Sequence, residues 1–320
     1  MHHPTPEIIL HQFAASPFSE KLRLVLGFKA LAYKSVKVPA IMPKPDVVAL
    51  TGGYRRTPFL QMGADIYCDT ALICEVLEKL QPKPTLYPTA NSALTRIFAQ
   101  WADSTLFWAA VTHNRGPKGA GSQFAAALND PMAAVFADRK AMGLDVTWFE
   151  PGDATLVYLN YLDRLTNMLQ GQPYLFGHQP CIADFCAYQP IWLVHIRSID
   201  SADLLQSYPD VKAWAERMKA IGHSNCEEIS STQAIGIAES SQPMPMGAGP
   251  LANTEFVNDH DIALGTQVSI SAESFGKEPT VGQLVAATAQ HFSLRRVDPR
   301  AKTVHVHFPR IGYVMKRVVG

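Results

Sequence analysis

A serine suited to stabilising an anion lies where the sequence changes from a predicted strand to a predicted helix. This residue, Ser16, belongs to the segment 14–21. The unpaired N–H groups and the dipole of a helix N-terminus favour an anion. Lowering a thiol pKa from about 8.5 to about 6.5 takes roughly 2.7 kcal/mol. A charge-assisted hydrogen bond of about 1.5–3 kcal/mol can supply this. Ser16 therefore suits a bound thiolate, although on this segment alone an ordinary N-cap is the commoner role.

A threonine–proline pair at the start of a predicted strand is the second candidate. Thr57 and Pro58 precede the apolar run that ends at Met62. X-Pro bonds are cis in only about 5% of folded cases, so the sequence leaves the isomer open. A cis bond would turn the N–H and C=O of Thr57 outward to pair with an extended peptide ligand. The alternative is a plain edge-strand proline.

An aspartate and a threonine before an apolar helical pattern are the third candidate. Asp69 could accept a hydrogen bond from a ligand ammonium, while Thr70 and the helix N-terminus hold the carboxylate of that ligand. Alternatively, these residues only cap the helix. Each of the three candidates is weak alone, so their order and spacing carry the argument.

Short strands and helices must position these candidates. The first 88 residues predict the order β-α-β-α-β-β-α, a mixed sheet flanked by helices. The predicted strands are 7–13, 35–38, 58–62 and 66–68, and the predicted helices are 18–26, a short one from 45, and 73–80.

The pattern changes twice along the rest of the chain. Residues 89–223 have helical period between Gly/Pro clusters and predict an all-α bundle. Residues 224–261 are rich in Ser, Gly, Pro, Met and Asn and are interpreted as a linker or wrapping segment. Strand signals return in residues 262–320 and predict a small β-barrel-like module. Residues 1–88 and these three segments are the predicted domains.

The three candidates, in this order, carry a family resemblance. Residues 7–88, with Ser16-Pro17-Phe18-Ser19, Thr57-Pro58 and Asp69-Thr70, resemble the thioredoxin-fold domain of the glutathione transferases. In the helical half, the segments 179–185 and 208–214 resemble the capping segment and a late helix of the family. The combination is fairly specific, although no single motif is.

The resemblance implies a glutathione-dependent transferase, or a related lyase or isomerase, that activates the glutathione thiolate to attack a small electrophile. Glutathione would be the co-substrate and the protein a homodimer. Arg55 and Arg56 both remain candidates for the glycyl carboxylate. The implied site residues are Ser16 at the thiol with Phe18 from the same motif, Thr57 beside cis-Pro58 at the cysteinyl backbone, and Asp69 with Thr70 at the γ-glutamyl end.

Two departures from the family pattern matter. The capping segment has Cys181 where the family usually has Ser or Thr, and a thiol is a weak cap, which costs that helix about 1 kcal/mol. Relatives with thiol-transfer activity usually have cysteine at the position of Ser16. Because Ser16 and Ser19 form no redox pair, disulfide exchange through a protein cysteine is not expected here.

Three further groups of residues are interpreted as structural. The last module carries eight basic and three acidic residues and the aromatic residues Phe292, Phe308 and Tyr313. It could bind single-stranded nucleic acid, but scattered charge on strands also discourages edge pairing, so a structural or partner-binding role is favoured. His305 and His307 share a strand face without a third ligand, so no metal site is expected. The cluster Trp101, Phe107 and Trp108 is interpreted as core.

Composition limits the remaining function classes. The 320 residues are 47% hydrophobic, and 28 Lys plus Arg balance 28 Asp plus Glu, which argues against electrostatic capture of nucleic acid or membrane by the whole chain. No apolar run approaches the roughly 18 residues of a membrane span. Five cysteines without metal spacing and no visible signal peptide predict a cytoplasmic protein. The alternative function is a non-enzymatic glutathione-binding or protein-interaction scaffold that uses the C-terminal module.

Overall fold

The computed structural model describes residues 7–115, 131–143, 149–196, 204–251, 255–257 and 259–318. The order of elements predicted for the first 88 residues is confirmed. The parallel pair β1–β2 and the antiparallel pairs β1–β3 and β3–β4 form the thioredoxin-like sheet. Its elements are β1 (Ile9–Gln12), α1 (Pro17–Phe28), β2 (Tyr33–Lys37), α2 (Pro45–Thr51), β3 (Phe59–Met62), β4 (Asp65–Cys68) and α3 (Thr70–Leu80).

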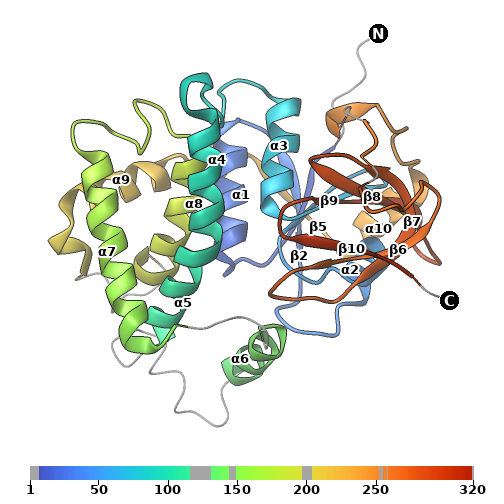
Figure 1. Ribbon diagram of the computed structural model, residues 1–320, viewed down its shortest axis with the longest axis horizontal. Helices are drawn as coiled ribbons and strands as arrows, with labels where there is room; N and C mark the ends of the chain where they lie inside the picture. Colours follow the sequence, from blue (N-terminus) through green and yellow to red (C-terminus); the bar gives the residue numbers. More distant parts are fainter. Residues whose placement is uncertain are drawn as a thin grey trace.

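The helical part follows α3, as the sequence predicts, and lies on the left in Figure 1. Helix α8 is buried along its whole length because most of its residues are apolar and its polar residues Asp184 and Gln189 are hydrogen-bonded, and it contacts both α1 and α4. One core therefore joins the thioredoxin-like sheet to the helices. The helical elements are α4 (Ser92–Trp101), the π-helical turn η2 (Ala102–Leu106), α5 (Phe107–Arg115), α6 (Pro131–Met142), α7 (Pro151–Leu169), α8 (Ile182–Ile191), the π-helical turn η4 (Trp192–Ile196) and α9 (Pro209–Ala220).

The segment 224–261 contains a strand, an α-helix and the short 3₁₀ helix η7 (Gly249–Leu251), none of which the sequence analysis predicted. Strand β5 (Cys226–Ile229) pairs in parallel with β2 and extends the sheet at that edge. Helix α10 (Ser231–Ser240) begins at the N-cap Ser230, whose hydroxyl accepts from the N–H of Gln233. The strand is short and largely exposed, so it has little apolar periodicity to reveal it.

The C-terminal strands form no barrel in the described residues, which corrects the prediction. They are β6 (Gln267–Ala272), β7 (Thr280–Ala287), β8 (His291–Asp298), β9 (Lys302–Pro309) and β10 (Tyr313–Arg317). Strand β9 pairs in parallel with β4, so these strands continue the thioredoxin-like sheet. The result is a ten-stranded sheet with the order β10-β6-β7-β8-β9-β4-β3-β1-β2-β5.

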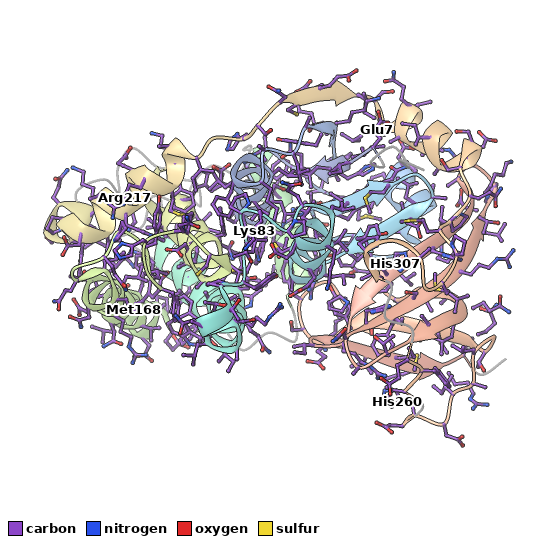
Figure 2. The ribbon with its side chains drawn as sticks, turned by 90° about the horizontal axis from the view of Figure 1, so that it is seen from above. Glu7, Lys83, Met168, Arg217, His260 and His307 are labelled. Atoms are coloured by element: carbon purple, nitrogen blue, oxygen red, sulfur yellow. The ribbon has the colours of Figure 1, made fainter. Side chains whose placement is uncertain are left out.

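We call residues 262–318 the extension. Its apolar side chains share one core with those of α2, β3 and β4, because β9 adds directly to the edge of β4. The thioredoxin-like part and the extension approach closely at Gly52, which ends α2 with a φ of +83°. A Cβ at this position would overlap the side chain of Arg296 from the extension. Figure 2 shows Met168 and Arg217 of the helical part at one end of the molecule and His260 and His307 at the other.

No helix in the described part of the chain combines the length and apolar character needed to cross a bilayer.

Candidate functional site

Ser16 is the N-cap of α1, so the capping role that the sequence analysis gave as the alternative is confirmed. Its hydroxyl accepts from the N–H of Ser19 at 3.2 Å. The same hydroxyl donates to the carbonyl of Thr57 at 3.3 Å. Ser16 is half-buried and faces a cavity. Turning the hydroxyl proton from the carbonyl toward the cavity would let it donate to an anion without disturbing the cap.

The peptide bond between Thr57 and Pro58 is cis. Pro58, directly before β3, is buried, and Thr57 is half-buried. Because Ser16 bonds to the carbonyl of Thr57, the first two candidate segments meet at one point, although 41 positions separate them.

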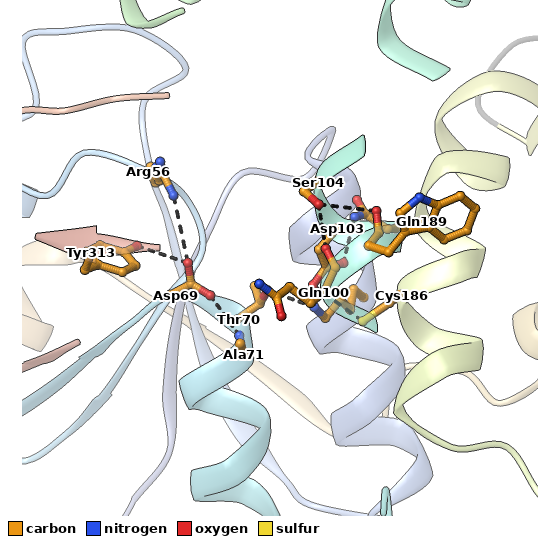
Figure 3. Close-up of polar contacts among 12 residues, drawn as sticks. Arg56, Asp69, Thr70, Ala71, Gln100, Asp103, Ser104, Cys186, Gln189 and Tyr313 are labelled. Atoms are coloured by element: carbon orange, nitrogen blue, oxygen red, sulfur yellow. Dashed lines mark hydrogen bonds and ion pairs between the residues drawn. The ribbon is translucent and has the colours of Figure 1, made fainter. Parts of the chain in front are cut away.

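Asp69 has an unusual backbone conformation and is held from several sides. Its φ is +74°, a region that non-glycine residues rarely adopt. Its N–H donates to the hydroxyl of Tyr54 at 3.1 Å, and its carboxylate accepts from the N–H of Ala71 at 2.9 Å. The hydroxyl of Tyr313 donates to the other carboxylate oxygen at 3.0 Å, and Arg56 lies 3.9 Å from the same oxygen (Figure 3). The extension therefore takes part in fixing this carboxylate.

Thr70 is buried and contacts a fully buried lysine. The ammonium of Lys21 donates to the Thr70 hydroxyl at 2.9 Å and to the carboxylate of Asp103 at 2.5 Å. Gln189 donates to the other oxygen of Asp103 at 3.0 Å. Burial lowers the pKa of Lys21, but the attraction of Asp103, the hydrogen bond to it and the nearby Cys186 and Cys74 together outweigh burial, so the net pKa is raised. Lys21 therefore stays charged, and it places a cation beside the N-terminus of α3.

Both arginines that the sequence offered as carboxylate ligands have protein partners. Arg55 pairs with Asp138 of α6 at 2.7 Å and with Glu278 of the extension at 3.1 Å. The guanidinium of Arg56 donates to the carbonyl of Phe275 at 2.6 Å through Nε and also through a terminal nitrogen. Both side chains still border the cavity.

A buried lysine adds to the positive charge near Arg55. Lys44 donates to the carbonyl of Arg55 at 3.3 Å. Burial, together with repulsion from Arg139 and Arg55, lowers the pKa of Lys44 to about 8. The cluster consists of three cations, Lys44, Arg55 and Arg139, and the two carboxylates of Asp138 and Glu278. Because positive charge is in excess, the cluster favours a further carboxylate.

All the predicted site residues border one large cavity. Its volume is about 2420 Å³, and it is bounded by α1, α3, α4, α5, α6 and the extension. The predicted residues on its wall are Ser16, Phe18, Thr57, Pro58, Asp69 and Thr70. The structure therefore brings together six residues that the sequence spreads over 55 positions, from Ser16 to Thr70.

Sequence reasoning missed Lys21, Asp103, Tyr313 and Phe275. One of them left a signal: Lys21 shares a helix face with Phe18 and Val25, where a charged residue implies a buried partner. Asp103 lies on the π-helical turn η2, which no local pattern predicts. Tyr313 begins β10 and Phe275 lies in the turn between β6 and β7, so the positions of both depend on strand pairings far along the chain.

The aromatic residues that the sequence analysis interpreted as structural differ in their surroundings. Phe292, Phe308 and Tyr313 are all buried, so none can stack on a nucleic-acid base. Trp108 is half-buried and borders the cavity, so it is not simply core.

The histidines of β9 belong to a buried network. His307 bonds to Asp65 at 3.0 Å and to Ser293 at 2.7 Å. All three side chains are buried where β9 joins β4, so the network holds the extension to the sheet. Among the described residues, no group of three or more His, Cys, Asp or Glu side chains could hold a metal ion.

Comparison with protein families finds two matches. Residues 10–85 match the N-terminal domain of glutathione S-transferase, and residues 158–221 match its C-terminal domain. Comparison with curated protein sequences gives no significant match.

Three solved structures illustrate the structural similarity. A GST-like protein from Pseudomonas syringae is 35% identical, with a TM-score of 0.81, and the match covers 98% of this chain and 100% of that one. A glutathione S-transferase from Rhodospirillum rubrum F11 is 20% identical, with a TM-score of 0.50 and coverage of 67% and 88%. A glutathione transferase family member from Pseudomonas fluorescens Pf-5, with two glutathione bound, is 14% identical, with a TM-score of 0.50 and coverage of 68% and 89%.

The last two structures share only the fold with this chain. The extension lies within the match to the Pseudomonas syringae protein, because that match spans almost the whole chain.

Proposed function

The chain belongs to the glutathione S-transferase family, and we propose that it binds glutathione and directs its thiolate at a small electrophile. The observation that carries this proposal is the meeting of Ser16 and Thr57 on the cavity wall, where a hydroxyl at a helix N-terminus touches a strand-end carbonyl.

Ser16 would hold the sulfur. Its hydroxyl turns from the Thr57 carbonyl to the thiolate, and the thiol proton leaves to solvent. The thiolate attacks an electrophilic carbon, so that a C–S bond forms while a leaving group departs with its electron pair. The contribution of the protein is positioning and thiolate stabilisation.

The other ends of glutathione match the charges around the cavity. Asp69 can accept from the γ-glutamyl ammonium, since Tyr313 and Ala71 leave carboxylate lone pairs available. Thr70, beside the cation of Lys21, suits the γ-glutamyl carboxylate. Arg55 and Arg139, which border the cavity, suit the glycyl carboxylate.

Calorimetric titration with glutathione tests the proposal, followed by conjugation assays with an aryl halide. Ser16→Ala is compared with Ser104→Ala, because Ser104 also borders the cavity but its hydroxyl donates to the backbone carbonyls of Gln100 and Trp101, in the preceding helical turn. We expect Ser16→Ala to lower the conjugation rate at least tenfold and Ser104→Ala to leave it unchanged. Equal rates in both variants would remove Ser16 from the mechanism.

One observation favours a second candidate function, a non-enzymatic scaffold. Asp69 and Arg56, which the family resemblance offers to the ligand, are engaged by Tyr313 and Phe275 of the extension. Measurable glutathione binding without turnover of any aryl halide would support this alternative.

Two further expectations remain predictions. Light scattering of the purified protein tests the homodimer. Fractionation of the source cells tests the cytoplasmic location. All five cysteines are free thiols, as a reducing compartment requires, and only Cys226 is exposed.

A further inference from the structure

A row of aromatic side chains runs along the cavity from the helix of Ser16 to the extension. Phe18 lies two residues after Ser16, and its ring centroid is 4.7 Å from that of Phe107. Phe107 is 5.0 Å from Trp108, and Trp108 is 5.0 Å from Phe275, with tilted or edge-on geometry at each step. All four border the cavity. The row therefore begins at the proposed sulfur position and ends outside the two matched family domains.

The turn that carries Phe275 is fixed in place from two sides. Arg56 donates to its carbonyl, and the N–H of Gly276 donates to the carbonyl of Met142 in α6 at 2.9 Å. Gly276 has a φ of +62°, and a Cβ there would overlap the Met142 side chain. The backbone of Phe275 is thus held by a turn whose positive φ favours glycine at position 276, as a preformed binding wall requires.

The cavity is larger than glutathione needs. Its volume of about 2420 Å³ exceeds the ~300–1,000 Å³ typical of small-molecule sites. Trp108 and Phe275 are each only half-buried, so both rings keep surface to offer a ligand. Aromatic side chains recognise planar rings by offset or edge-on contact, which adds to the gain from burial.

We propose that the extension builds the far wall of the second-substrate subsite, and that Phe275, which packs against Trp108, selects electrophiles with a bulky aromatic group. This inference rests on the proposed function for the position of the sulfur. It goes beyond that function because it assigns substrate choice to a segment outside the thioredoxin-like and helical parts.

Binding of S-substituted glutathiones tests this inference. Calorimetry would compare glutathione, S-methylglutathione and S-benzylglutathione on the wild type, Phe275→Ala and Trp108→Ala. Phe256→Ala is the matched control, because Phe256 is an exposed phenylalanine near the extension that does not border the cavity.

We expect the wild type and Phe256→Ala to bind S-benzylglutathione at least tenfold more tightly than S-methylglutathione. In Phe275→Ala this preference should fall to threefold or less, while the affinity for glutathione itself stays within twofold. A full tenfold preference in both Phe275→Ala and Trp108→Ala would overturn the inference.

A second ligand tests the aromatic wall independently of glutathione binding. If the wild type binds no glutathione, that function fails, and titration with 1-anilinonaphthalene-8-sulfonate still tests the aromatic wall. At least fivefold weaker binding of this probe to Phe275→Ala than to Phe256→Ala would support the wall. Equal binding would refute it.

Discussion

Replacing Asp103 with asparagine would remove the anionic partner of Lys21 while keeping the shape of the side chain. Lys21 is fully buried, and its ammonium would retain only the Thr70 hydroxyl among the partners described above. At an effective dielectric constant of about 20, charges this close attract by several kcal/mol. Breaking a buried pair costs about 3–5 kcal/mol because a charge is left without its partner. Asp103 is 19% exposed, so we expect a loss of about 3 kcal/mol, at the low end of that range.

Urea unfolding followed by circular dichroism would measure this loss as a lower midpoint with an unchanged slope. The control is Glu75→Gln, which breaks the exposed pair between Glu75 and Arg96 and should cost less than about 1 kcal/mol. The double variant Lys21→Met/Asp103→Asn should recover part of the stability, because it leaves no buried charge. An Asp103→Asn effect no larger than that of Glu75→Gln would refute the assignment of Lys21 as a buried, charged lysine.

Three further predictions follow from other contacts. Tyr313→Phe removes the donor to Asp69 and should weaken glutathione binding about fivefold by calorimetry, whereas unchanged or tighter binding would mean that Tyr313 only competes with the ligand. Burial lowers the pKa of His11 and of His291 to about 4. As the pH falls, the unfolded chain therefore binds these protons near pH 6.5, whereas the folded chain binds them only near pH 4. The free energy of unfolding should fall between pH 6.5 and pH 4, and a flat profile would contradict this. Cys181→Ser supplies a better N-cap for α8 and should raise the urea midpoint by the equivalent of about 1 kcal/mol, whereas a lower midpoint would show that the thiol is needed for packing.

Local sequence patterns were sufficient to predict the strands and helices that position the candidate site. The apolar alternation before Ser16 and the helical spacing after it predict β1 and α1, because both patterns lie within a few residues of one another. The same holds for β3, β4 and α3 around Thr57 and Asp69. Ser16, Thr57 and Asp69 come together because β1, β3 and β4 are neighbours in the sheet and each candidate residue lies near an end of one of these strands.

The partners of these residues could not be predicted, since they depend on pairings far along the chain. Strand β9 carries a clear alternation, but nothing in its own sequence says that it pairs with β4 rather than closing a barrel. That pairing is what brings Tyr313 to Asp69 and Phe275 to Arg56. A local pattern identifies which face of a strand is apolar, whereas the edge it joins is decided by the whole sheet.

The pKa of the glutathione thiol in the binary complex tests the central claim most directly. Ultraviolet absorbance of the thiolate, titrated against pH in the wild type and in Ser16→Ala, gives this value. We predict a pKa of about 6.5 in the wild type and a return toward about 8.5 in the variant, because the hydroxyl of Ser16 supplies the stabilising bond. The same lowered pKa in both proteins would contradict the account.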